Sequence, residues 1–97
     1  MILEIVDEFD TGTPLYEWSI VRVVFDLSRR NYRVVYDSGR SSDAAFEGWT
    51  SLHWGQPLTA KQAHRRVRSY DTRLRRLNHK MACADAIKAH AKERRLW

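Results

Sequence analysis

The chain has 97 residues, of which 43% are hydrophobic and 11% aromatic, which is enough for one modest core and too few residues for two domains. It carries a formal net charge of +5 and a single cysteine, so an intrachain disulfide is excluded. Its longest apolar stretches fall far below the ~18 residues of a membrane span, and its acidic start is unlike a signal peptide. We therefore expect one soluble, cytoplasmic domain over residues 1–97.

The charge is divided between an acidic first half and a basic second half. Residues 1–58 carry five arginines and nine acids, a net charge of −4, whereas residues 59–97 carry twelve lysines or arginines and three acids, a net charge of +9. Such polarity favours polyanions or acidic protein surfaces as partners of the basic end. The alternative is a solvated helix whose excess charge serves only solubility.

The first 40 residues predict a three-stranded antiparallel meander within about residues 2–36. Its expected strands are 2–6, 18–25 and 32–36. The second strand is rich in β-branched residues and is mostly apolar on both faces, so we expect it to be central.

The triplet Asp-Thr/Ser-Gly occurs twice, at 10–12 and 37–39, and resembles the active-site signature of aspartic proteases. In that family the two carboxylates come from two related all-β halves and share a proton. Here the triplets lie only 27 residues apart, which is too short for a lobe. We interpret them as turns, in which the aspartate accepts backbone hydrogen bonds and the glycine takes unusual backbone angles.

Residues 40–58 form an aromatic connector without clear periodicity. Aromatic side chains in a segment of small polar residues are expected to pack onto the sheet, around one short helical turn. Trp49 and Trp54 are alternatively candidates for stacking on bases or for anchoring in a partner's pocket.

From Thr59 the sequence predicts a long, basic, amphipathic helix over about residues 59–96. A capping box, Thr-Ala-Lys-Gln, starts it, and no glycine or proline follows. We expect one continuous helix, bent or broken if anywhere near 78–85, in preference to a helical hairpin. Its apolar stripe becomes rich in alanine past residue 81, which suggests a homodimer through this seam as a further hypothesis. The stripe comprises Ala60, Ala63, Val67, Tyr70, Leu74, Leu77, Met81, Ala84, Ile87 and Ala91.

The basic residues of this helix are the candidate binding residues. Arginine outnumbers lysine in the first cluster, and guanidinium groups match phosphate or carboxylate geometry in a bidentate way. On one straight helix the second cluster would lie about 30 Å from the first, roughly one turn of duplex away. The candidates are Arg65, Arg66, Arg68, Arg73, Arg75, Arg76 and Lys80 in the first cluster, and Lys88, Lys92, Arg94 and Arg95 in the second.

The sequence contains no phosphate-binding glycine loop, nucleophile elbow or zinc-protease motif, so we expect no enzyme and no cofactor. His79 and Cys83 stand four residues apart, and His90 follows two turns later. A structural zinc site normally needs four ligands at recognisable spacing, so we expect no metal site either.

The sequence thus predicts an α+β domain that acts as a small binding protein. The leading hypothesis is that its arginine-rich helix engages DNA or RNA mainly through phosphates. The alternative is a protein-interaction module, such as a phage or mobile-element type inhibitor or adaptor, that docks the helix on an acidic surface of a host nucleic-acid-handling protein. A membrane surface is not expected as a partner, because the alanine-rich stripe lacks bulky anchors.

Overall fold

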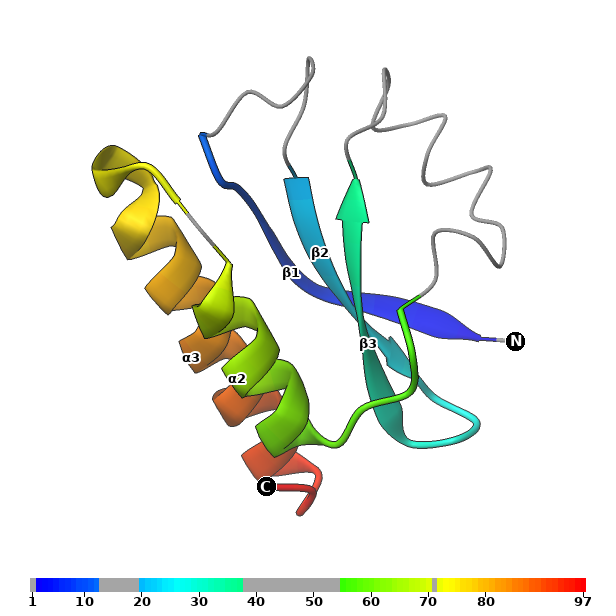
Figure 1. Ribbon diagram of the computed structural model, residues 1–97. Helices are drawn as coiled ribbons and strands as arrows, with labels where there is room; N and C mark the ends of the chain where they lie inside the picture. Colours follow the sequence, from blue (N-terminus) through cyan, green and yellow to red (C-terminus); the bar gives the residue numbers. More distant parts are fainter. Residues whose placement is uncertain (1, 13–19, 38–54, 71) are drawn as a thin grey trace.

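The computed structural model describes residues 2–12, 20–37, 55–70 and 72–97 (Figure 1). A three-stranded antiparallel sheet is followed by helices that lie on one of its faces, which confirms the predicted α+β class. The elements are β1 (Leu3–Asp10), β2 (Ile20–Asp26), β3 (Asn31–Asp37), α2 (Ala60–Ser69), the 3₁₀ turn η1 (Leu74–Arg76) and α3 (Leu77–Glu93). Trp49 and Trp54 lie outside the described residues, as does most of the aromatic connector.

The sheet has the order β1-β2-β3, with β2 in the centre as predicted. Alternate residues of β2 point to opposite faces: Val21, Val23 and Phe25 face the helices, and Val24 is buried on the other side. This burial on both faces explains why β2 is apolar in both of its alternating sets. The β2–β3 turn is closed by Asp26, whose Oδ1 accepts from the Ser28 hydroxyl at 2.6 Å and thereby lowers the pKa of the carboxyl.

The first Asp-Thr-Gly triplet is a turn, as interpreted from the sequence. The Gly12 amide donates to Asp10 Oδ1 at 2.8 Å, and Gly12 has a φ of 74°, in the region that favours glycine. In the second triplet only Asp37, the last residue of β3, belongs to the described part of the chain.

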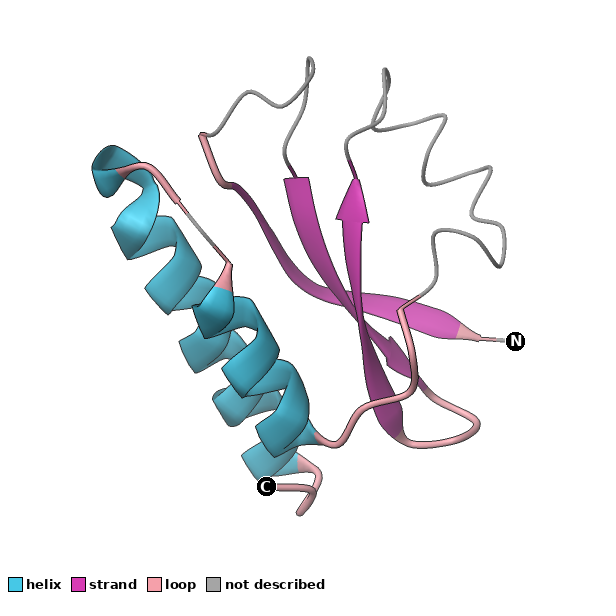
Figure 2. Cartoon of the chain, in the orientation of Figure 1, coloured by secondary structure: helices cyan, strands magenta, loops and turns pink. Residues whose placement is uncertain are grey.

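The prediction of one continuous helix over 59–96 is wrong. α2 and α3 are antiparallel and lie side by side (Figure 2). The capping box at Thr59 is present as predicted, but α2 ends at Ser69, where the next residue, Tyr70, has extended backbone angles. The break therefore falls before residue 74, and residues 78–85 lie within the regular helix α3.

Two physical causes account for the break. A helix over 59–96 would be about 57 Å long at 1.5 Å per residue, whereas the longest strand has 8 residues and spans about 27 Å, so about half of the apolar stripe would extend past the sheet. The segment 69–72, Ser-Tyr-Asp-Thr, also combines residues of low helix propensity. Carbonyl groups at the end of α2 accept hydrogen bonds from nearby side chains. The Ser69 hydroxyl donates to the Arg66 carbonyl at 2.7 Å, and Lys80 Nζ donates to the Tyr70 carbonyl at 3.1 Å.

Folding back lets both helices bury their small residues against the sheet, α2 against β3 and α3 against β1. Ala63, Cys83, Ala84, Ile87 and Ala91 are fully buried, together with the helix-facing side chains of the strands. The alanine-rich seam behind the homodimer hypothesis is thus covered by the chain itself. It does not offer a free surface to a second copy.

Residues 55–58 pair with the free edge of β3 through a bridge between Tyr32 and Leu58, with N–H···O distances of 2.9 and 2.7 Å. Gly55 lies so close to β3 that a Cβ atom would come within 2.2 Å of the Val34 carbonyl oxygen. The absence of a side chain at Gly55 is what permits this approach.

Candidate functional site

The helical hairpin separates the two predicted basic clusters to its opposite ends. We call residues 65–70 and 72–80, on either side of the α2–α3 connection, the hairpin tip; in Figure 1 it comprises the yellow-green end of α2 and the yellow start of α3. The other end carries the second cluster at residues 88–95. The expected display of both clusters along one straight helix, across a turn of duplex, is therefore wrong.

Five arginines of the hairpin tip are exposed: Arg65, Arg66, Arg68, Arg73 and Arg75. Within the described residues none of them forms a salt bridge with a carboxylate. Arg66 and Arg68 stand in the last turn of α2, where cations interact favourably with the helix dipole. The hairpin tip thus presents guanidinium groups whose charge is not neutralised by the described carboxylates.

Arg76 and Lys80, also predicted as binding residues, are only partly exposed and contact other parts of the chain. The Arg76 side chain packs over Gly12. A Cβ atom added to Gly12 would come within 2.8 Å of Arg76 Cγ. Lys80 is bonded to the end of α2 as described above, and the Arg73 amide donates to the Thr11 carbonyl at 3.0 Å. These contacts fix the hairpin tip against the end of β1 and so hold the exposed arginines in place.

The second basic cluster is partly engaged within the chain. Arg94 Nη2 lies 3.2 Å from Glu4 Oε1 and its Nη1 donates to the His90 carbonyl at 3.0 Å. Lys88 Nζ lies 5.4 Å from the ring centroid of Trp97, a cation–π contact. Of the four residues of this cluster, Lys92 and Arg95 are exposed, and Lys88 and Arg94 are partly buried. This end therefore offers fewer free cations than the hairpin tip.

A polar chain that the sequence did not predict joins β3, α3 and β1. The Tyr32 hydroxyl lies 2.7 Å from His90 Nδ1, and His90 Nε2 lies 2.5 Å from Glu4 Oε1. An ionised carboxylate only accepts, so Nε2 carries a proton, and in the neutral ring Nδ1 accepts from the phenol. The hydrogen bond from His90 holds the pKa of Glu4 below its usual value, helped by Arg94 and opposed by burial, whereas burial raises the pKa of Tyr32.

The order hydroxyl, imidazole, carboxylate resembles that of nucleophile, base and orienting group in hydrolases. Here, however, burial raises the pKa of the Tyr32 phenol and so disfavours the phenolate that would act as nucleophile, and the side chain is buried in the core. Phe25 also packs its ring 4.9 Å from the rings of both Tyr32 and His90. These observations favour a structural role, in which the chain of hydrogen bonds fastens the end of α3 to the sheet.

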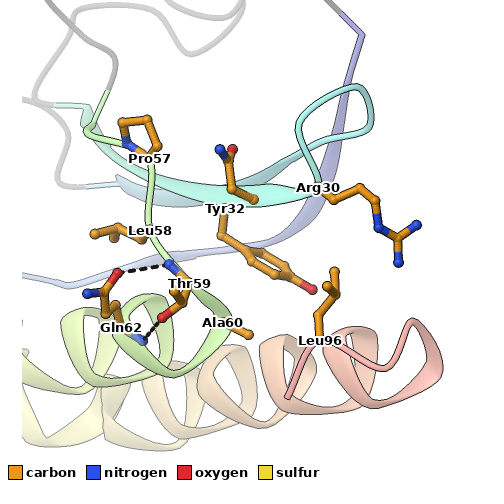
Figure 3. Close-up of a pocket in the computed structure, with 9 residues that line it drawn as sticks. Arg30, Tyr32, Pro57, Leu58, Thr59, Ala60, Gln62 and Leu96 are labelled. Atoms are coloured by element: carbon orange, nitrogen blue, oxygen red, sulfur yellow. Dashed lines mark hydrogen bonds between the residues drawn. The ribbon is translucent and has the colours of Figure 1, made fainter.

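A hollow of about 310 Å³ lies beside Tyr32, between β3, the start of α2 and the C-terminal residues (Figure 3). Tyr32, Leu58 and Leu96 give it an apolar lining. Most of its polar groups are occupied: Thr59 and Gln62 bond each other in the capping box, and Arg30 donates to the Arg94 carbonyl. The exception is Asn31, which also lines the hollow and whose buried Oδ1 has no hydrogen-bond partner. The hollow therefore has room for a small ligand but few free groups that could form hydrogen bonds with it.

In the described part of the chain, no three His, Cys, Asp or Glu side chains come close enough together to hold a metal ion. Cys83 is buried, and burial raises the pKa of its thiol to about 12, which keeps the free thiol protonated near neutral pH. Neither helix of the described residues combines the length and the apolar character that crossing a membrane requires.

The fold and the site define a small α+β domain in which a helical hairpin with an arginine-rich end packs on one face of a three-stranded antiparallel sheet. The chain belongs to the family described as Domain of unknown function (DUF7574), which matches residues 1–95. No curated protein and no solved structure matches the chain at a significant level.

Proposed function

We propose that the protein is a small, non-enzymatic binding protein whose hairpin tip engages nucleic acid, mainly through phosphates. The observation that supports it is the group of exposed arginines without carboxylate partners among the described residues. Guanidinium groups bind phosphate oxygens in a bidentate way, and each contact releases counterions from the nucleic acid. The exposed arginines lie on the second half of α2 and around η1, so their contacts would be confined to this part of the hairpin.

The proposal is tested by fluorescence polarisation with a labelled DNA duplex and a labelled single strand of the same sequence, at several salt concentrations. The test variant combines Arg65→Gln, Arg66→Gln and Arg75→Gln in the hairpin tip. If these three arginines contact phosphates, the plot of log affinity against log salt becomes flatter by about 2.7 units, at about 0.9 per contact on duplex DNA. Affinity at low salt falls at least about tenfold.

The matched control removes the same charge from exposed residues outside the hairpin tip, by Arg29→Gln, Lys92→Gln and Arg95→Gln. We expect its affinity to stay within about threefold of the unaltered protein, because net charge alone acts weakly at distances beyond the Debye length. An equal loss in both variants would refute a localised site. Absence of binding by the unaltered protein at low salt would refute nucleic-acid binding altogether.

A further inference from the structure

The hairpin tip also carries an exposed apolar stripe. Leu74 is 85% exposed, Leu77 39% and Met81 36%. These residues stand three and four positions apart, the spacing that brings side chains onto one helical face. They belong to the amphipathic stripe read from the sequence, whose later members, Ala84 and Ile87, are fully buried in the core. Single exposed leucines are common, but three on one face form a patch that suggests a partner.

The charges nearest to Leu74 and Leu77 in this apolar stripe are positive, and the exposed Asp85 follows one turn after Met81, at the far end of the stripe. Within residues 72–84 the chain has Arg73, Arg75, Arg76 and Lys80 and no acid. Arg73 and Arg75 are exposed directly beside Leu74. A surface of this kind complements one that has apolar side chains in its middle and carboxylates on its flanks.

A second copy of the chain does not meet this requirement. Two hairpin tips face to face would bring like charges together, which opposes their association. The acidic strand β1, with Ile5 exposed, is the chain's own complementary surface. Its contact with the hairpin tip of another copy would be head to tail and would generate open filaments unless the rotation closed a ring.

We propose that the apolar stripe Leu74–Leu77–Met81 is a docking surface for an acidic amphipathic helix of another protein. Leucine-type side chains of that helix, repeating every three or four residues, pack on Leu74 and Leu77, and the flexible Met81 side chain adapts to them. Carboxylates on its flanks pair with Arg73 and Arg75. The docking of an acidic helix does not require nucleic-acid binding. Arg75 would contact either ligand, so the acidic helix and the nucleic acid compete for the hairpin tip.

The probe is a labelled synthetic helical peptide of about 18 residues, since much shorter isolated helices are marginal in water. It carries leucine at helical spacing with glutamate on the flanks, and its binding is followed by fluorescence anisotropy. A second peptide replaces the leucines by serine, and a third replaces the glutamates by glutamine. We expect binding of the first peptide, at least about tenfold weaker binding of the third, and no binding of the second.

The protein variants are Leu74→Gln alone and Leu74→Gln combined with Leu77→Gln and Met81→Gln. Glutamine is a good helix former and the positions are exposed, so circular dichroism should show an unchanged fold. The single variant weakens peptide binding by about tenfold and the triple variant abolishes it. The control, Ile2→Gln with Leu27→Gln, removes exposed apolar side chains of the sheet region and leaves binding unchanged.

Four results would overturn the docking proposal. These are no binding of the leucine–glutamate peptide, equal binding of the serine peptide, loss of oligonucleotide binding in Leu74→Gln, and a concentration-dependent dimer that Leu74→Gln abolishes. The third result would assign the stripe to nucleic acid and the fourth to self-association. Failure of the proposed function is seen separately, because it appears in the oligonucleotide titration of the unaltered protein.

Discussion

Replacement of Tyr32 by phenylalanine should destabilise the fold through the loss of one buried hydrogen bond. Phenylalanine keeps the aromatic ring, which contacts Phe25 and His90, so the packing is preserved. It leaves His90 Nδ1 without the phenol 2.7 Å away, at a side chain that is only 13% exposed. An unsatisfied buried polar group costs about 1–3 kcal/mol, which lowers the melting temperature by roughly 4–20 °C in a domain of this size.

The free energy of unfolding is measured by urea denaturation, followed by circular dichroism and tryptophan fluorescence at pH 7. The control is Ser69→Ala, which removes an exposed hydroxyl that bonds the Arg66 carbonyl and should cost at most about 0.5 kcal/mol. A Tyr32→Phe protein as stable as Ser69→Ala would refute the reasoning. It would show that the hydroxyl does not help to fasten α3 to the sheet.

Two further predictions concern stability. The pKa of Glu4 is lower in the folded state than its unfolded-state value near 4.5, so ionised Glu4 stabilises the fold. This stabilisation is complete at a pH above the unfolded-state pKa and is lost as the pH falls through the folded-state pKa. Urea midpoints from pH 7 to 3 should therefore drop less steeply in acid for Glu4→Gln than for the unaltered protein, and parallel profiles would contradict this. Gly55→Ala should cost about 1–3 kcal/mol by the same urea assay, because its Cβ meets the Val34 carbonyl oxygen; an unchanged midpoint would show that this segment moves aside freely.

The sheet and the start of the helical region were predictable because their causes are local. The β-branched run of β2 indicated a central strand, and the capping box at Thr59 marked the first residue before α2. The break after Ser69 is not predicted by the local sequence, because no glycine or proline interrupts the helical pattern there. The cause of the break lies in the tertiary structure, because the sheet can cover two short antiparallel helices but not one long helix.

The exposure of the candidate binding residues was predicted in part, and their role in binding stays a prediction. The exposed arginines of the hairpin tip were identified from the sequence, but Arg76, Lys80, Lys88 and Arg94 proved to have contacts within the chain. The partner of His90 could not be found by any local spacing, because Glu4 lies 86 positions away. The exposure of Leu74 could not be predicted from the sequence either. Periodicity shows which residues share a helix face, but it does not show where the sheet beneath that face ends.

The hydrogen bonds of Glu4 also constrain the order in which the protein folds. Its partners, His90 and Arg94, are 86 and 90 positions later in the chain, and Thr11 is bonded to Arg73 across a similarly wide interval. The entropy cost of closing a loop rises with its length, so these are late contacts in folding. During synthesis β1 is made before the other described elements, yet Glu4 cannot reach its final partners until residues 90–94 have been made. The earliest of the described strands is therefore completed late.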